Sequence, residues 1–196
     1  MVASMAKTTT EEEIRAYTIG EPQPLTAPIL VSDYDPAWPR LFEREATRIR
    51  SALGARVQLL EHAGSTSVPG LPAKPLIDII LAVPDSSDES TYVPEMERAG
   101  YVLRIREPHW FEHRVFKGPD TDVNLHVFTA GCAEIDQMLL FRDWLRARPD
   151  ERDLYAAKKR ELARQEWKFV QHYADAKTGI VHEILARARA AGGTAS

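Results

Sequence analysis

The sequence predicts an α+β fold, with one mixed sheet in the middle of the chain and a helical C-terminal third. Three observations support this. The chain has 196 residues, an ordinary length for one domain, and 44% of them are hydrophobic. Short apolar segments with strand-like alternation occupy the middle, and helical periodicity dominates after residue 133. We expect residues 1–28 to form a flexible arm with a short helix, residues 29–190 a single domain, and residues 191–196 a frayed tail.

Charge and composition exclude several classes of protein. The formal net charge is −4, which argues against extended nucleic-acid binding. Cys132 is the only cysteine, which excludes an internal disulfide and any multi-cysteine metal site. No apolar run approaches the roughly 20 residues that span a bilayer, and the N-terminus lacks the apolar core of a signal peptide. A cytoplasmic protein without a membrane segment is therefore expected.

The first third of the chain predicts an arm followed by one long helix. A cap-like Thr-rich opening precedes a short helix over residues 11–17, and a proline-rich extended segment follows. Residues 29–32 are compatible with a short edge strand. Asp35 and Pro36 favour the start of a helix that reaches Leu53, with a buried stripe of Trp38, Leu41, Phe42, Ala46 and Ile49. Gly54 is expected to end this helix.

The stretch from residue 57 to residue 83 organises the rest of the chain. An apolar strand is expected over residues 57–60, followed by the polar pair Glu61-His62 and a small-residue turn at residues 63–67. A second strand covers residues 76–83 and is apolar except for Asp78. Burying a charged group is costly unless a partner compensates it, so Asp78 indicates either a structural partner or a bound cation or nucleotide.

The remaining helices and strands are predicted from hydrophobic periodicity and from the glycine and proline residues that interrupt it. Strands are expected over residues 101–105, 113–116 and 122–128, a short helix over residues 92–99, and longer helices over residues 134–148, 151–173 and 175–190. In the strand over residues 122–128, Val123, Leu125 and Val127 share one face, and Asp122, Asn124, His126 and Phe128 share the other.

Four blocks carry a resemblance to a known family. They are residues 34–39 (YDPAWP), residues 61–79 (EHAGSTSVPGL and AKPLIDI), residues 124–128 (NLHVF) and residues 141–146 (FRDWLR), with a weaker match at Tyr155 and Lys158. Together they resemble the GrpB family, which is grouped with the nucleotidyltransferase superfamily fold. The resemblance implies a nucleotidyltransferase-like mixed sheet of four to five strands flanked by helices. Similar domains occur fused to dephospho-CoA kinase, where they are described as aiding folding rather than catalysing.

The superfamily pattern assigns roles to the organising stretch. The Gly64-Ser65 turn, with Thr66, matches the turn that holds the phosphates of a nucleoside triphosphate. Carboxylates on the next strand hold a divalent metal, Mg²⁺ or Mn²⁺, and Asp78 matches one of them. Ile80 stands where the second carboxylate is expected. The resemblance therefore implies an unusual ligand set or a lost metal site; the candidate ligands are Asp78, His126, His62, Glu61 and Asn124.

Further side chains are candidates for binding the nucleotide. Lys74 and Arg142 would neutralise phosphates, while Tyr155 and Lys158, three residues apart on a helix, would contact a base and a phosphate. Structural roles stay open for all of these residues: an ion pair of Asp78 with Lys74 or Arg142, a satisfied core His126, a plain helix cap at residues 64–67, a solvated Lys74, a surface pair of Arg142 with Asp143, and exposed helix neighbours at Tyr155 and Lys158. The string His109-x-x-Glu112-His113 does not lie on a predicted helix and is expected to be loop and strand decoration.

Two functions remain open at the level of sequence. In the first, a metal-dependent nucleotidyltransferase-like protein binds a nucleoside triphosphate and transfers a nucleotidyl group to a small-molecule or protein acceptor, with Asp78, Ser65 and His126 as catalytic residues. In the second, a non-catalytic nucleotide-binding, folding-accessory or interaction module keeps the pocket with an incomplete metal site. Ile80 favours the second and the retained polar cluster favours the first. A homo-oligomer is compatible with either function.

Overall fold

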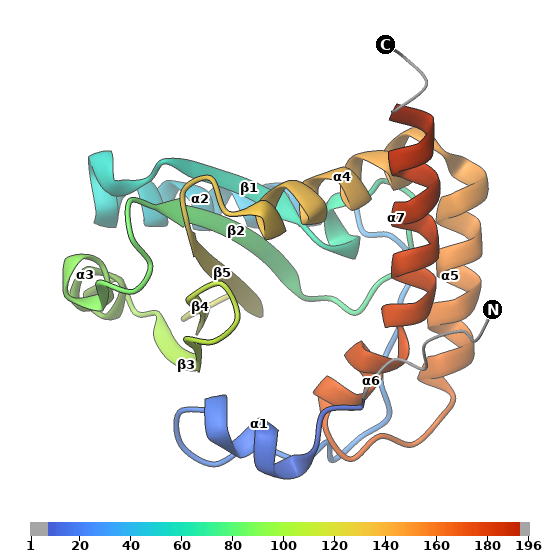
Figure 1. The fold of residues 1–196 in the computed structure, drawn as a ribbon, viewed down its shortest axis with the longest axis horizontal. Coiled ribbons are helices and arrows are strands. Elements are labelled where there is room, and N and C mark those ends of the chain that lie inside the picture. Colours follow the sequence, from blue (N-terminus) through green and yellow to red (C-terminus); the bar gives the residue numbers. More distant parts are fainter. Residues whose placement is uncertain (1–7, 193–196) are drawn as a thin grey trace.

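The computed structural model describes residues 8–192 as an α+β fold built on one five-stranded mixed sheet (Figure 1). The strands are β1 Leu59–Ala63, β2 Ile77–Val83, β3 Val102–Glu107, β4 His113–Lys117 and β5 Val123–Thr129, in the spatial order β1-β2-β5-β4-β3. The predicted fold class is confirmed. Residues 193–196, most of the expected frayed tail, lie outside the described part of the chain, and residue 192 still belongs to the last helix.

The central strands β2 and β5 run parallel, and every other neighbouring pair is antiparallel. The parallel register places Asp78 beside Asn124 and Ile80 beside His126. Because side chains alternate between the faces of a strand, these four side chains share one face of the sheet. The expected alternation along β5 is visible in its burial, with Val123, Leu125 and Val127 fully buried on the opposite face.

One face of the sheet packs against α2 Trp38–Leu53 and α3 Val93–Arg98. α2 begins later than the predicted start at Asp35 and Pro36: its N-cap is Ala37, which has no side-chain cap, and Pro39 lies in its first turn. The Asp35 carboxylate accepts a hydrogen bond from the Ala37 backbone N–H at 2.8 Å in the turn before the helix. Gly54, with φ of +56°, ends the helix. The main hydrophobic core lies in this layer, and its fully buried members include Ile49, Ile79, Leu81, Val127 and Met96.

The other face carries the C-terminal helices. α4 Ala133–Ala147 crosses this face and buries Ile135 against Ile80 and Phe128. α5 Pro149–Ala163 and α7 Thr178–Gly192 stand side by side beyond the end of α4, and α6 Val170–Ala176 lies below them in Figure 1. These helices form a wall at the end of the sheet where β2 begins.

The single helix expected over residues 151–173 is wrong, because the chain breaks between α5 and α6. The Trp167 indole N–H donates to the Leu162 carbonyl at 2.9 Å and so satisfies a backbone group at the end of α5. The Lys168 carbonyl accepts from the Leu25 N–H at 2.9 Å, a contact 143 residues away in sequence. Both contacts are side-chain or tertiary interactions, which cannot be predicted from helical periodicity.

The N-terminal segment runs along the body of the protein. α1 Glu11–Tyr17 begins with a capping box between Thr10 and Glu13. The segment that follows pairs Thr18 with Ile105 of β3 before it reaches the α5–α6 connection. The strand expected at residues 29–32 is reduced to one bridge between Ser32 and Ala73. Short 3₁₀ turns occur at Gly54–Arg56 (η1), Ser65–Ser67 (η2) and Glu89–Thr91 (η3). Within residues 8–192, no helix has the length and apolar character to cross a bilayer.

Candidate functional site

The turn between β1 and β2 lies directly on the carboxylate of Asp78. Gly64 follows β1 with φ of +63°, a conformation that side chains rarely adopt. A Cβ atom added to Gly64 would lie 2.2 Å from Asp78 Oδ2. Only glycine therefore lets η2 approach the carboxylate, and Ser65, the first residue of η2, is held at this position.

Asp78 is solvent-accessible although it lies deep in the fold. Its side chain is 25% exposed, Asn124 Nδ2 donates to Asp78 Oδ1 at 3.1 Å, and His126 Nε2 lies 3.5 Å from the same oxygen. Burial acts to raise the pKa of Asp78, but the interactions with His126 and Asn124 outweigh it and hold the pKa below its ordinary value. Lys117 Nζ donates to Asn124 Oδ1 at 2.6 Å, which fixes the orientation of the amide.

A row of two imidazoles extends from Asp78 across the sheet. His126 Nδ1 lies 3.0 Å from His113 Nε2, and His113 Nδ1 lies 2.7 Å from Glu107 Oε2. Burial lowers the pKa of His113 to about 4, so His113 is neutral at neutral pH. Glu107 accepts a hydrogen bond from His113 Nδ1, which makes His113 Nε2 the acceptor of a hydrogen bond from His126 Nδ1. The other nitrogen of His126, Nε2, faces Asp78 and helps to keep the pKa of that carboxyl low.

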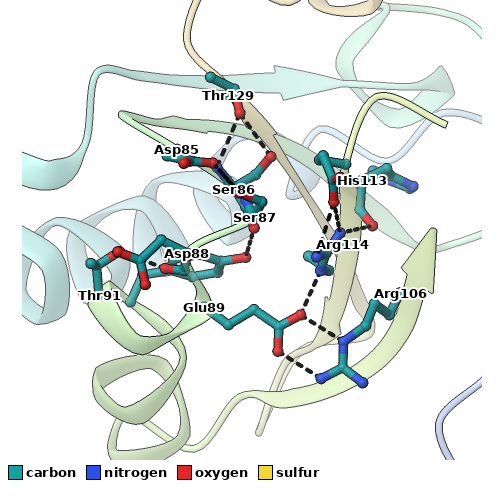
Figure 2. A network of polar contacts seen from close by, with 12 residues as sticks. Asp85, Ser86, Ser87, Asp88, Glu89, Thr91, Arg106, His113, Arg114 and Thr129 are labelled. Atoms are coloured by element: carbon teal, nitrogen blue, oxygen red, sulfur yellow. Dashed lines mark hydrogen bonds and ion pairs between the residues drawn. The ribbon is translucent and has the colours of Figure 1, made fainter. Parts of the chain in front are cut away.

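A network of ion pairs fixes the end of β4 that carries His113 (Figure 2). Glu89, in η3, accepts from Arg106 Nε and from Arg114 Nε, both at 2.6 Å. Arg114 is 4% exposed and so is held almost without solvent. Thr129, at the end of β5, joins the same loop through Ser86. The loop after β2 therefore ties β3, β4 and β5 together and holds the imidazole row in place.

Two lysines of the C-terminal helices interact electrostatically with Asp78. Burial lowers the pKa of Lys159 to about 7 and also lowers the pKa of Lys177. Lys159 Nζ donates to the Pro72 carbonyl, and Lys177 Nζ lies 4.6 Å from the centre of the Tyr173 ring. Among the described residues, neither lysine has a carboxylate within 4 Å.

A cavity of about 490 Å³ lies beside these groups, and Lys177, Tyr155, Trp110 and Glu134 are part of its wall. Asp78, His126 and Lys159 are not part of the wall, but Asp78 and His126 interact electrostatically with wall residues. Burial raises the pKa of Tyr155, whose hydroxyl interacts with Ser65. We call the cavity, the imidazole row and the two lysines together the Asp78 cleft.

The structure brings together only part of the set predicted from sequence. Asp78, His126, Asn124, Ser65, Gly64 and Tyr155 belong to the Asp78 cleft. Thr66 is buried and bonds to the Leu76 carbonyl. Lys158 lies on another side of α5, where its Nζ donates to Glu161 at 2.8 Å. Lys74, before β2, is partly exposed and interacts electrostatically with Lys117.

Arg142, Glu61 and His62 lie away from the Asp78 cleft. Arg142 Nη1 donates to Glu61 at 2.7 Å and to the His62 carbonyl at 3.0 Å, so it holds α4 against the edge strand β1. The register pairs His62 with Ile79, which directs the imidazole to the opposite face of the sheet from Asp78. There it stacks on Phe42 with ring centres 4.9 Å apart, and burial lowers its pKa to about 4.

The residues present do not fit the metal site that the resemblance implies. Ile80 is fully buried against Phe128 and Ile135, so hydrocarbon stands where the second carboxylate is expected. Within residues 8–192, no three His, Cys, Asp or Glu side chains converge as metal ligands. Asp78, His126 and Asn124 lie close together, but they supply one carboxylate and form a hydrogen-bonded row that ends in protein groups.

Several groups of the Asp78 cleft are missing from the prediction. Lys159 was detectable, because it lies four residues after Tyr155 and so shares its helix face more closely than Lys158 does. His113 belongs to the sequence string that was predicted to have no functional role. Its position on β4, next to β5, brings it into contact with His126. Lys177 lies between two helices, where periodicity carries no signal.

The comparisons with known proteins agree on one family. The family model described as GrpB protein matches residues 28–187. A UPF0157 protein of Halalkalibacterium halodurans is 64% identical over 181 residues, covering 92% of this chain and 93% of that protein. The crystal structure of the conserved protein GrpB from Enterococcus faecalis matches with a TM-score of 0.72 and 32% identity, over 81% of this chain and 96% of that one. A dephospho-CoA kinase of Mycolicibacterium paratuberculosis is 29% identical over 171 residues, which cover 74% of this chain but 42% of the kinase.

Proposed function

The chain belongs to the GrpB family, and from this membership and the geometry of the Asp78 cleft we propose that it binds a nucleoside triphosphate and transfers the nucleotidyl group to an acceptor hydroxyl. One observation carries the proposal. A solvent-accessible carboxylate–imidazole pair, Asp78 and His126, interacts electrostatically with two lysines that lack carboxylate partners among the described residues. This arrangement supplies a proton acceptor opposite a site for phosphate.

The phosphates are the part of the ligand that this cleft recognises best. Lys159 is buried, Lys177 is partly buried, and neither has a counter-ion in the described chain. An oxyanion bound between them would supply the missing negative charge and favour their protonated forms. The Ser65 hydroxyl can donate to a further phosphate oxygen from the turn at Gly64. A cavity of about 490 Å³ is of the size that small ligands occupy.

In the transfer step, the oxygen of the acceptor hydroxyl forms a bond to the α-phosphorus, and the bond from that phosphorus to the bridging oxygen breaks. Pyrophosphate leaves with the electron pair, and its charge is stabilised by Lys159 and Lys177. The acceptor proton passes to the imidazole of His126, whose Nδ1 contacts His113 and whose Nε2 faces Asp78. Asp78, 3.5 Å away, stabilises the imidazolium that forms.

Nucleotide binding is the first measurement that tests the proposal. At a nucleotide concentration about 100 times Kd, ATP is expected to stabilise the wild-type protein by about 2.7 kcal/mol, visible as a thermal shift. Lys177→Ala is expected to weaken ATP binding by about tenfold or more, because it removes a charge-assisted contact to phosphate. The matched control is Lys168→Ala, an exposed lysine that pairs with Glu11. Equal ATP affinity in both variants contradicts the proposal.

Lys159 makes the affinity depend on pH. Its pKa of about 7 in the free protein should rise when a phosphate binds beside it, so binding takes up a proton above pH 7. ATP affinity is therefore expected to fall as the pH rises from about 7 to about 9. Isothermal titration in buffers of different ionisation enthalpy measures the uptake directly. Lys159→Met is expected to abolish it, and an unchanged uptake in that variant would assign the proton to another group.

A non-catalytic role is the second candidate, and the burial of Ile80 favours it. In this reading the cleft binds a nucleotide but does not transfer it, as in an accessory domain attached to an enzyme. The partial match to dephospho-CoA kinases is compatible with such a domain. ATP binding without pyrophosphate release, across a panel of acceptors with and without Mg²⁺ or Mn²⁺, would support this role over transfer.

A further inference from the structure

A second cavity, of about 610 Å³, lies along β1 and shares no wall residue with the cavity of the Asp78 cleft. It is bounded by α2, the edge strand β1, the end of η2 with Pro69, the last turns of α4 and the first turn of α5. Its wall contains four arginines, Arg50, Arg142, Arg146 and Arg152. We call it the arginine cavity.

Two of the four arginines are largely occupied by structural contacts. Arg142 donates to Glu61 and to Asp143, and its side chain is 9% exposed. Arg146 donates to the Ser67 carbonyl through Nε at 3.0 Å and Nη2 at 2.8 Å. Both arginines share Asp143, and burial together with the charge of Arg142 lowers the pKa of Arg146. Glu61 and Asp143 therefore balance the charge of these two arginines.

The other two arginines have donors without a protein partner. Arg50 extends from the exposed side of α2 and has no ion pair or side-chain hydrogen bond among the described residues. Arg152 donates from Nη1 to the Pro69 carbonyl, while its buried Nε donates no hydrogen bond and lies 3.6 Å from Asp153. Glu43 and Glu61 also line the cavity, and Glu61 is already paired with Arg142. Within the described chain, Arg50 therefore lacks a counter-ion and Arg152 keeps an unused donor.

From this arrangement we infer that the arginine cavity is a second binding site, for a small molecule that carries a multiply charged oxyanion. Guanidinium groups bind phosphate and carboxylate oxygens through two parallel N–H donors, and Arg50 and Arg152 have donors to spare. The volume exceeds that of a single ion, and Phe42, stacked on His62, supplies an apolar wall for the remainder of the ligand. This site does not depend on nucleotide binding in the Asp78 cleft.

Titration calorimetry with pyrophosphate, and with malonate as a dicarboxylate, tests this inference on the full chain. The Lys177→Ala background removes a lysine from the Asp78 cleft, and pyrophosphate is still expected to bind. Adding Arg50→Gln and Arg152→Gln should weaken it by about tenfold or more. The matched control, Arg15→Gln with Arg98→Gln, removes two exposed arginines elsewhere and should bind like the background.

The two anions distinguish the kinds of ligand that the arginine cavity binds. Binding of pyrophosphate alone identifies a phosphorylated ligand, and binding of malonate as well identifies a general oxyanion site. Failure of both anions to bind at millimolar concentration, or equal affinity in the arginine and control variants, overturns the inference. If the double arginine variant does not fold, Arg50→Glu at an exposed position provides the same comparison. ATP affinity unchanged by the arginine substitutions, but lowered by Lys177→Ala, separates this site from the proposed nucleotide site.

Discussion

Replacing Gly64 with alanine is expected to destabilise the protein by about 3 kcal/mol or more. The added Cβ would lie 2.2 Å from Asp78 Oδ2 and 2.8 Å from Asp78 Cβ, far inside van der Waals contact. It would also occupy φ of +63°, which costs an alanine additional free energy. Either η2 or β2 must move, and both carry groups of the Asp78 cleft. Chemical denaturation measures the free energy of unfolding.

Gly131→Ala is the matched control for this prediction. Gly131 has φ of +81°, but a Cβ added there meets no atom within 4 Å. It should therefore show the cost of the backbone conformation alone, about 1 kcal/mol. The difference between the two variants isolates the close approach of the turn to Asp78. If Gly64→Ala is no more harmful than Gly131→Ala, the turn does not depend on that contact.

Asp78→Asn is expected to reduce nucleotidyl transfer by a factor of about 10² or more while leaving the fold intact. The amide has the shape of the carboxylate and can still accept from Asn124, but it lacks the charge that stabilises a protonated His126. ATP binding should persist or tighten, because the substitution removes a negative charge near the phosphates. Pyrophosphate release from ATP reports the transfer step for any acceptor.

The control for this second prediction is Asp122→Asn. Asp122 lies just before β5, its side chain is 62% exposed, and its nearest cation is Lys117 at 3.9 Å. This variant should retain both binding and pyrophosphate release. A loss of ATP binding in Asp78→Asn, with release per bound nucleotide unchanged, would show that Asp78 acts in binding and not in transfer.

Strand periodicity predicted the centre of the Asp78 cleft, and tertiary packing determined the rest. Alternation placed Asn124 and His126 on one face of β5, the family resemblance implied that they lie near Asp78, and the register of β2 and β5 brings the three together. Arg142 could not be located in this way. Its binding to Glu61 and to the His62 carbonyl depends on how α4 crosses β1, which no local pattern encodes. The contribution of Lys177 likewise depends on the angle between α6 and α7.

The way each outer strand is covered limits how copies of this chain can associate. At β3, Thr18 pairs with Ile105 and the Ile19 N–H donates to the Arg104 carbonyl, so the segment after α1 occupies the open backbone. At β1, the Arg142 guanidinium donates a hydrogen bond to the His62 carbonyl. Incoming strands would have to displace these groups before they could extend the sheet. Any oligomer of the folded chain is accordingly expected to form through helix surfaces rather than by strand addition.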